Sequence, residues 1–229
     1  MSPPGNPRVM AVIPAYNPGP GLTPVLQAAG RELGQDAVIV VDDGAQDGAG
    51  ERARAAGVRV ITHPVNRGKG AALRTGFAAA LAAGAEWVFT LDADGQHDPA
   101  EMPAFLAAAK SGGADLWIGD RMRNTADMPW LRRLANQSTS SIISALAGQP
   151  IADSQSGYRL IGAPVLRALD LRFDRFEAES EILIKASRAG FRIGAVSIRT
   201  IYGEERSTIH PIRDTVRFIS LVLKLWLHS

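Results

Sequence analysis

Residues 87–97 read Trp-Val-Phe-Thr-Leu-Asp-Ala-Asp-Gly-Gln-His, a short apolar run that ends in two carboxylates. The apolar part, Trp87 to Leu91, has the length and composition of a strand buried on both faces of a sheet. Asp92 and Asp94 follow at the carboxyl end of that strand. Ligands of open α/β sheets gather outside the carboxyl ends of strands, so this stretch marks a candidate site.

Similar apolar runs bounded by turn residues recur through the first half of the chain. They are Val9 to Ile13, Ala37 to Val41, Val58 to Thr62 and Leu116 to Gly119. Between them lie Ala-rich stretches with helical periodicity, such as 70–83 and 99–110. The alternation predicts an α/β fold in which a doubly wound, mostly parallel sheet of five strands has helices on both faces. Asp98 and Pro99 fit the N-cap and first position of one helix, and Glu101 fits its capping-box acid.

The two ends of the chain differ from residues 9–209, which we expect to form one domain. Residues 1–8 are rich in Pro and Gly and lack a signal-peptide pattern, so we expect a flexible start. Residues 210–229 carry an apolar stripe at helical spacing, too short and too charged to cross a bilayer. They predict an amphipathic helix that either lies on a membrane surface or packs on the domain.

Composition excludes several classes of function. The 229 residues are 46% hydrophobic and 21% charged, as in ordinary globular proteins, and their net charge is +2. That mild charge argues against a nucleic-acid partner, while phosphates and lipid headgroups stay suitable. Cysteine is absent, which excludes disulfides, thiolate metal sites and a cysteine nucleophile. We expect a cytoplasmic protein.

The carboxylates after the strand at 87–91 predict a metal site. Asp92 and Asp94 would repel one another unless a cation lay between them. Mg²⁺ or Mn²⁺, held by both carboxylates, the Gln96 carbonyl and water, would bridge a diphosphate and offset the charge on a departing nucleoside diphosphate. These three residues are the candidate metal ligands.

Other strand ends carry side chains suited to a nucleotide. Residues 42–44, Asp-Asp-Gly, end the second strand, and a carboxylate there is predicted to select a nucleobase by hydrogen bonding. The first strand ends in Pro-Ala-Tyr-Asn at 14–17, where Tyr16 is placed to stack on a base. Residues 66–70, Asn-Arg-Gly-Lys-Gly, with Arg74 one turn later, offer backbone donors, a helix N-terminus and cations for phosphate. They lack the glycine and Ser/Thr positions of a Walker loop.

Five motifs in this order resemble glycosyltransferase family 2, especially its dolichyl-phosphate mannose synthase-like branch. They are Ile-Pro-Ala-Tyr-Asn, Val-Val-Asp-Asp-Gly, Asn-Arg-Gly-Lys-Gly, Asp-Ala-Asp-Gly-Gln-His and Gly-Asp-Arg. The resemblance implies a GT-A fold and an inverting transfer of a hexose from GDP-mannose, UDP-glucose or a similar nucleotide-sugar donor to a polyprenyl phosphate. Residues 9–120 would then form the nucleotide-sugar half and residues 121–209 the acceptor half.

Individual roles follow from the residues and the resemblance together. The candidate nucleotide contacts are Pro14, Ala15, Tyr16, Asn17, Asp42, Asp43, Lys69, Arg74, Asp92 and Ala93. The candidate acceptor contacts are Arg133, Gln155, Ser156, Arg159 and Arg206. Arg121 matches an arginine that meets phosphates in that branch, and Asp153 opens a segment that borders the acceptor there. Ala45 replaces a serine of many relatives, and their C-terminal transmembrane helices are missing, so we expect peripheral attachment to the inner face of the membrane.

The nature of the acceptor decides whether a general base is needed. A hydroxyl acceptor must lose a proton, and Asp153 is then the first candidate base and His97 the second. A phosphate acceptor is already anionic and needs cations to orient it. The arginines above favour the lipid phosphate. The catalytic candidates are therefore Asp92, Asp94, Arg121 and Asp153, while Glu177, Glu179 and Glu181 fit a solvated or ion-paired helix face.

Four other functions compete with this one. The first is a glycosyltransferase that acts on a hydroxyl of a cell-envelope glycan. A phosphatase of the haloacid dehalogenase type also uses Asp-x-Asp-Gly, although on its first strand and with Thr or Val next. A nucleotidyltransferase needs a basic loop after the first strand, and residues 14–21 contain no basic residue. The last is a non-enzymatic module that recruits partners to a membrane.

Overall fold

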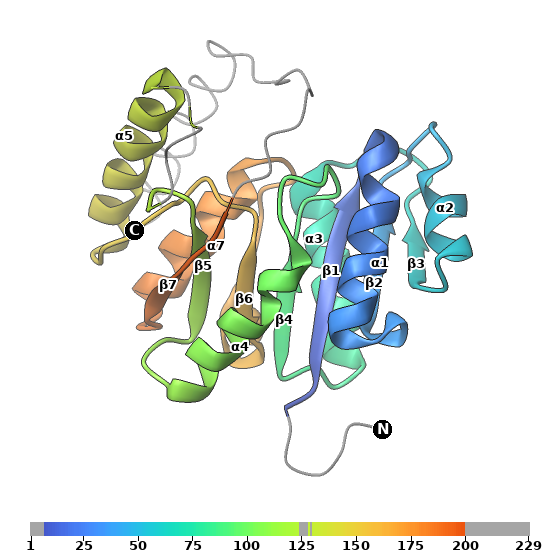
Figure 1. The fold of residues 1–229 in the computed structure, drawn as a ribbon. Helices are drawn as coiled ribbons and strands as arrows, with labels where there is room; N and C mark the ends of the chain where they lie inside the picture. The colour runs from blue at the N-terminus through green and yellow to red at the C-terminus, as the bar shows by residue number, and fades with distance from the viewer. Residues whose placement is uncertain (1–6, 124–127, 129, 200–229) are drawn as a thin grey trace.

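The computed structural model describes residues 7–123, 128 and 130–199, and within them seven strands form one sheet (Figure 1). The strands are β1 (Val9–Ala15), β2 (Val38–Asp42), β3 (Arg59–Thr62), β4 (Trp87–Thr90), β5 (Leu116–Asp120), β6 (Arg159–Gly162) and β7 (Ile193–Ser197). Their order is β3-β2-β1-β4-β6-β5-β7, in which β6 is antiparallel to β4 and β5 and the other pairs are parallel. The predicted α/β fold with a mostly parallel sheet is confirmed.

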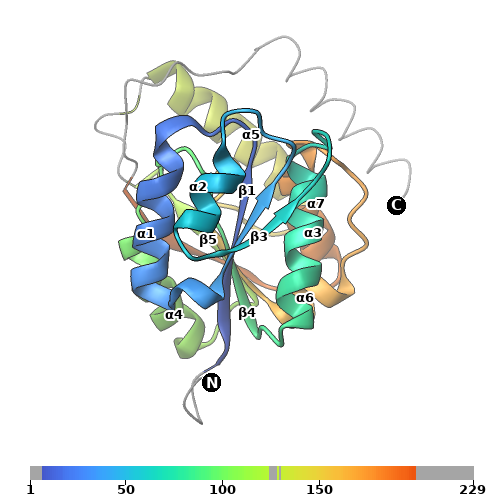
Figure 2. The same cartoon turned by 90° about the vertical axis from the view of Figure 1, so that its right-hand side faces the viewer.

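Helices cover both faces of the sheet, as the side view shows (Figure 2). On one face lie α1 (Leu22–Leu33), α2 (Ala49–Ala55) and α4 (Met102–Ser111). On the other lie α3 (Lys69–Ala82), α5 (Trp130–Ala147), α6 (Ala163–Ala168) and α7 (Glu177–Arg188). Three short 3-10 turns, η1 (Gly19–Gly21), η2 (Gln35–Ala37) and η3 (Pro99–Glu101), precede α1, β2 and α4.

The central strands are apolar along their length because both of their faces are buried. In β2, Ile39 and Val41 join the core beneath α3, whereas Val38 and Val40 join the core beneath α1. All of β2 is buried. This two-sided burial explains why the sequence shows continuous apolar runs rather than an alternating pattern.

Close packing of α3 on β1 brings the start of that helix to the carboxyl edge of the sheet. Gly76 faces Val12 so closely that an added Cβ would lie 2.2 Å from the Val12 Cγ1. No larger residue fits this crossing without a shift of helix or strand. Lys69, the first residue of α3, is thereby held near the ends of β1 and β4.

Two features differ from the prediction. The sheet gains β6 and β7 from the second half of the chain, where β6 is four residues long and opens with a buried arginine, Arg159. The Asp98 cap is confirmed, because its carboxylate accepts a hydrogen bond from Ala100 N at 2.9 Å. Glu101 does not complete a capping box; its Oε1 accepts instead from Arg199 N, at the end of the described chain, at 2.9 Å.

Some predictions concern residues that the structure does not describe. They are the amphipathic helix at 210–229, Arg206 and most of the flexible start at 1–8. Within the described ranges, none of the helices combines the length and the apolar content that crossing a bilayer requires.

Candidate active site

The carboxyl ends of β1, β2 and β4 lie side by side because β1 pairs in parallel with both neighbours. Ala15 is in register with Asp42, and Val12 is in register with Thr90. A hydrogen bond of 2.8 Å from Asp43 N to Ala15 O continues the pairing beyond the strands. The segments that carry the predicted metal and nucleotide residues therefore meet at one edge of the sheet.

Lys69 is the centre of an ion-paired cluster at this edge. Its Nζ contacts Asp92 Oδ1 and lies 3.0 Å from Glu179 Oε1. The exposed fraction of the Lys69 side chain is only 15%. Phe176, at the start of α7, places its ring centroid 5.7 Å from the same nitrogen. Two segments far from Lys69 in sequence, the turn after β4 and the start of α7, thus meet at its ammonium group.

Electrostatics favours the charged forms of Lys69 and Asp92. Burial alone would raise the pKa of Asp92, but the Lys69 charge and hydrogen bond outweigh it and lower that pKa to about 2. Burial likewise opposes the charge of Lys69, while Asp92 and Glu179 raise its pKa above the ordinary value. Because the pKa of Asp92 is lowered, its contribution to stability is complete above the ordinary aspartate range and is lost as the pH falls toward 2.

The other candidate metal ligands lie in the turn after Asp92. Asp94 Oδ1 accepts a hydrogen bond from Gln96 N at 2.9 Å, which closes the turn. Asp92, Asp94 and Gln96 are each partly exposed. In the part of the chain that the structure describes, no three acidic or histidine side chains are grouped so as to hold a metal ion.

His97 lies beneath this turn in an apolar setting. Its side chain is 3% exposed and packs on Tyr158, with ring centroids 5.4 Å apart. Burial lowers the pKa of His97 to about 4, against the opposing charge of Asp92, 3.8 Å from its Nε2. His97 is therefore neutral near pH 7.

Gly157 makes a close approach to Asp92 that a side chain would disturb. A Cβ at Gly157 would lie 2.5 Å from Asp92 Oδ2, and the Gly157 carbonyl is held by a hydrogen bond of 2.7 Å from Thr90 Oγ1. The carboxylate must therefore rotate away in a Gly157→Ala variant. We expect a loss of activity of about 10²-fold, as for a misplaced catalytic group. Because the rotation also disturbs the ion pair between Asp92 and Lys69, the free energy of unfolding should fall by about 1–3 kcal/mol, the usual cost of overpacking.

Steady-state kinetics and urea denaturation of Gly157→Ala check this expectation. Wild-type activity in a stable variant would show that the orientation of Asp92 does not matter.

Asp43 is buried, and both of its carboxylate oxygens bond to other groups of the protein. Its Oδ1 lies 2.6 Å from His63 Nδ1 and accepts from Arg67 N at 3.0 Å, while its Oδ2 accepts from Gly68 N at 2.7 Å. Both oxygens are thus engaged by His63 and by the backbone of residues 67 and 68. Base selection by Asp43 stays a prediction, and it would require an exchange of partners.

The remaining nucleotide candidates lie around the same edge. Tyr16 is 51% exposed, as stacking on a base requires. Asn17 adopts a positive φ of 48° and accepts from Gln46 N at 2.7 Å, which shapes the loop after β1. Asp42 Oδ1 accepts from Ala45 N at 2.9 Å within its own turn. Pro14, Ala15 and Ala93 contribute backbone at strand ends.

Arg74 was predicted to meet phosphate, but it is engaged elsewhere. Its guanidinium donates to Phe173 O at 2.7 Å and pairs with Asp174. These bonds tie α3 to the loop before α7. The placement argues against a phosphate contact for Arg74.

Arg121 and Asp153 form a buried pair. The Nε of Arg121 lies 2.7 Å from Asp153 Oδ2, and its NH2 lies 3.0 Å from Oδ1. Asp153 has no exposed surface, and Gln155 N also donates to its Oδ1 at 3.2 Å. Both carboxylate oxygens are thus occupied, which argues against Asp153 as a general base and for a role in orienting Arg121.

The four predicted acceptor residues that the structure describes, which leave out Arg206, do not form one exposed surface. Arg159 is 1% exposed and donates to the backbone oxygens of Ser154, Ser156 and Glu179 at 3.0, 2.9 and 2.7 Å. It holds the 153–157 segment against α7 and lies out of an acceptor's reach. Ser156 is fully buried, whereas Gln155 and Arg133 are exposed.

Two glutamates of α7 form ion pairs with lysines and are largely shielded from solvent. Glu179 fits the predicted ion-paired face, with Lys69 as its partner. Glu181 is wholly buried, pairs with Lys185 at 2.7 Å, and accepts from Arg172 N and Phe173 N at 2.9 and 3.1 Å. The apolar neighbours of Glu181 along α7 are the signal that could have revealed its burial.

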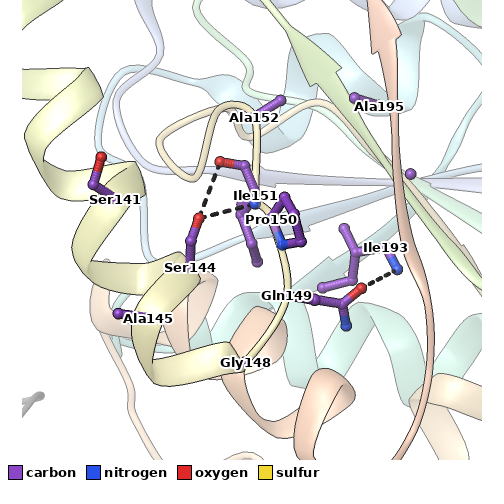
Figure 3. Close-up of a pocket in the computed structure, with 11 residues that line it drawn as sticks. Ser141, Ser144, Ala145, Gly148, Gln149, Pro150, Ile151, Ala152, Ile193 and Ala195 are labelled. Carbon is purple, nitrogen blue, oxygen red and sulfur yellow. Dashed lines mark hydrogen bonds between the residues drawn. The ribbon is translucent and has the colours of Figure 1, made fainter.

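A groove lined by residues of the second half of the chain lies apart from the predicted site residues (Figure 3). It is an open groove of about 790 Å³ between α5, the 148–152 loop and β7. Its polar groups are paired, since Ser144 Oγ accepts from Ile151 N at 2.9 Å and Gln149 Oε1 accepts from Ile193 N at 3.0 Å. None of the predicted site residues lines it. The candidate active site is therefore the carboxyl edge, on chemical grounds.

An α/β sheet with an acidic turn and a buried lysine at its carboxyl edge suits an enzyme that handles phosphorylated ligands. Residues 10–168 match the family described as Glycosyl transferase family 2. The chain belongs to this family, and it is therefore a glycosyltransferase.

Two relatives show which branch of this family the chain resembles. The chain is 32% identical to the UDP-N-acetylglucosamine–dolichyl-phosphate N-acetylglucosaminyltransferase of Methanococcus voltae, over 95% of this chain and 96% of that protein. It is also 32% identical to the undecaprenyl-phosphate mannosyltransferase of Micrococcus luteus, over 86% of this chain and 85% of that protein. The resemblance to the polyprenyl-phosphate branch is thus confirmed.

A solved structure supports the GT-A fold. Glucosyl-3-phosphoglycerate synthase from Mycobacterium tuberculosis superposes with a TM-score of 0.75 at 21% identity, over 96% of this chain and 80% of that chain. That enzyme has been crystallised with Mg²⁺ and uridine diphosphate, and also with Mn²⁺.

Proposed function

We propose that this glycosyltransferase is a metal-dependent, inverting enzyme that moves a hexose from GDP-mannose or UDP-glucose to a polyprenyl phosphate. The observation that carries the proposal is the Lys69–Asp92 pair beside Asp94, at the edge where β1, β2 and β4 end. Residues 9–120 would bind the donor and residues 121–209 the acceptor.

The donor set of the acidic turn fits a hard divalent cation. Asp92, Asp94 and Gln96 offer oxygen atoms within one partly exposed turn. Mg²⁺ commonly takes one or two protein carboxylates, several waters and substrate phosphates, so a closed cage of protein ligands is not needed. When bound, the ion would neutralise charge on the departing diphosphate. Lys69 would add its positive charge to the same phosphates, and Tyr16 would stack on the base.

Two observations favour a phosphate acceptor over a hydroxyl. The first candidate base, Asp153, spends both oxygens on Arg121, and the second, His97, is buried beneath the turn. An anionic acceptor needs no base; it needs a cation to orient it. Arg121 is such a cation, and its charge also contributes to lowering the pKa of Asp92, which places the two groups within electrostatic range. The hydroxyl of a cell-envelope glycan is the alternative acceptor.

The amphipathic stripe predicted at residues 210–229 supports a peripheral position on the inner face of the membrane. A lipid acceptor would be met there.

A donor and acceptor panel tests the proposal. GDP-mannose, UDP-glucose and UDP-N-acetylglucosamine, each radiolabelled in the sugar, are incubated with Mg²⁺ or Mn²⁺ and polyprenyl phosphate. We expect label to enter the organic phase with at least one donor, and EDTA to prevent it. Unphosphorylated polyprenol is the matched control and should take up none. Transfer to polyprenol at the same rate would overturn the proposal that the acceptor is a phosphate. Transfer that continues in EDTA would overturn the proposal that the enzyme depends on a metal.

A further inference from the structure

We propose that His63 is a positioning residue for Lys69, which acts through Asp43 on the loop that presents Lys69 to the donor diphosphate. The inference rests on the donor site argued above. His63 directly follows β3 and is 5% exposed, so it is not placed to touch a substrate. What it touches instead is the carboxylate that organises residues 66–68.

Three donors fix the Asp43 carboxylate in one orientation. They are His63 Nδ1, Arg67 N and Gly68 N, at 2.6, 3.0 and 2.7 Å. A carboxylate that accepts from backbone N–H groups has no hydrogen to offer the ring, so Nδ1 of His63 carries the proton and donates it. Hydrogen bonds to an ionised acceptor are about twice as strong as neutral ones. His63 therefore sets the direction in which Asp43 holds the loop.

The second ring nitrogen ties this arrangement to α3. Its Nε2 lies 2.9 Å from Thr75 Oγ1, and Ala71 O, which accepts from the same hydroxyl inside the helix, lies at 3.1 Å. With the ring proton on Nδ1, Nε2 accepts as well, so the one hydroxyl hydrogen is shared between these two acceptors. Asp43, His63 and Thr75 stand in the order of a hydrolase triad. Because the hydroxyl is bonded within its own helix, we assign it as a tether. His63 thereby links the ends of β2 and β3 to the first two turns of α3.

The loop is clamped from its other side as well. Gly68 has φ of +98°, and a Cβ there would lie 2.3 Å from Asp174 O. Ala71 N donates to the same carbonyl at 3.1 Å. Lys69 follows Gly68 directly, so its backbone is fixed between these two supports while its Nζ reaches Asp92 and Glu179. Loss of one support would displace the ammonium, and a misplacement of about 1 Å is enough to matter chemically.

The same contacts limit what the loop offers to phosphate. The N–H groups of Arg67 and Gly68 are occupied by Asp43 and are not directed at a ligand. The loop therefore acts on the diphosphate through the charge of Lys69. A change at His63 should weaken binding of a nucleoside diphosphate and leave binding of the nucleoside unchanged.

Two polar substitutions of His63 separate its two bonds. The amide nitrogen of asparagine lies where Nδ1 lies and can still donate to Asp43, whereas that of glutamine lies closer to the position of Nε2 and reaches Thr75. We expect His63→Gln to weaken GDP or UDP binding about tenfold, and His63→Asn to stay within about threefold of wild type. Calorimetry in Mn²⁺ buffer measures both, with guanosine and uridine as ligands that lack the phosphates and thermal melting to compare the folds.

The outcomes separate the proposed role of His63 from the proposed donor site. Equal diphosphate affinities of the two variants, or a loss for the nucleoside as large as for the diphosphate, would overturn the role of His63. Failure of the wild-type protein to bind either diphosphate would instead overturn the donor site itself.

Discussion

Asp94→Ala is expected to lower kcat by about 10³-fold, the size of effect seen when a preorganised charge that stabilises a transition state is removed. The side chain lies in the turn after β4, partly exposed and beside Asp92, where the donor diphosphate is proposed to bind. Without Asp94 the turn keeps only the Asp92 carboxylate, whose charge Lys69 already offsets, so a divalent ion should bind there much more weakly. The fold should survive, because Asp94 lies outside the two cores.

The matched control is Asp94→Asn, which separates charge from turn structure. Its Oδ1 can still accept from Gln96 N, so the turn keeps the bond seen at 2.9 Å. We expect this variant to match wild type in urea denaturation but to lose nearly as much activity as the alanine variant. Calorimetry should show no heat of donor binding that EDTA removes. Full activity of Asp94→Asn would show that the negative charge of Asp94 is not needed to hold the ion.

The sequence predicted the centre of the fold well, for a physical reason. Strands such as β2 are buried on both faces and carry a continuous apolar run, which few other structures explain. The edge of the sheet was harder to foresee. Arg159 opens β6 and donates to the backbone oxygens of Ser154, Ser156 and Glu179. Its burial depends on how the loop before β6 and α7 pack around it, which residue types alone do not reveal.

The residues of the candidate site also fall into those that the sequence could predict and those that it could not. Asp92 and Asp43 were predictable because each directly follows a buried strand, and parallel strands bring their carboxyl ends together. Glu179 and His63 were not, since their partners depend on how α7 and β3 pack against α3. Spacing along one segment carries no information about the register of another.

Asp153 illustrates how position in the sequence can suggest a role that the packing does not support. The sequence places it beside a motif that borders the acceptor, and a carboxylate there suggests a base. Only the packed structure shows that both oxygens face Arg121. What the structure shows is a carboxylate that holds the Arg121 guanidinium in one orientation.

The largest loss of stability is expected from Asp153→Ala. Asp153 is wholly buried and neutralises Arg121, which is 8% exposed. Its removal leaves a buried guanidinium without that carboxylate, and breaking a buried ion pair in this way costs about 3–5 kcal/mol. Urea denaturation measures the loss, and a value below about 1 kcal/mol would mean that Arg121 finds water or another acceptor at little cost.

A double variant, Arg121→Leu with Asp153→Leu, distinguishes packing from chemistry. Replacement of a whole buried pair by apolar residues is often neutral for stability, so most of the free energy of unfolding lost in Asp153→Ala should return. Activity toward polyprenyl phosphate should not return, because the acceptor would have lost the cation that orients it. The single variant Arg121→Lys, which keeps the charge but not the two-pronged geometry, should retain part of the activity. Wild-type rates in the double variant would show that Arg121 serves the fold alone and that the acceptor phosphate is oriented by another group.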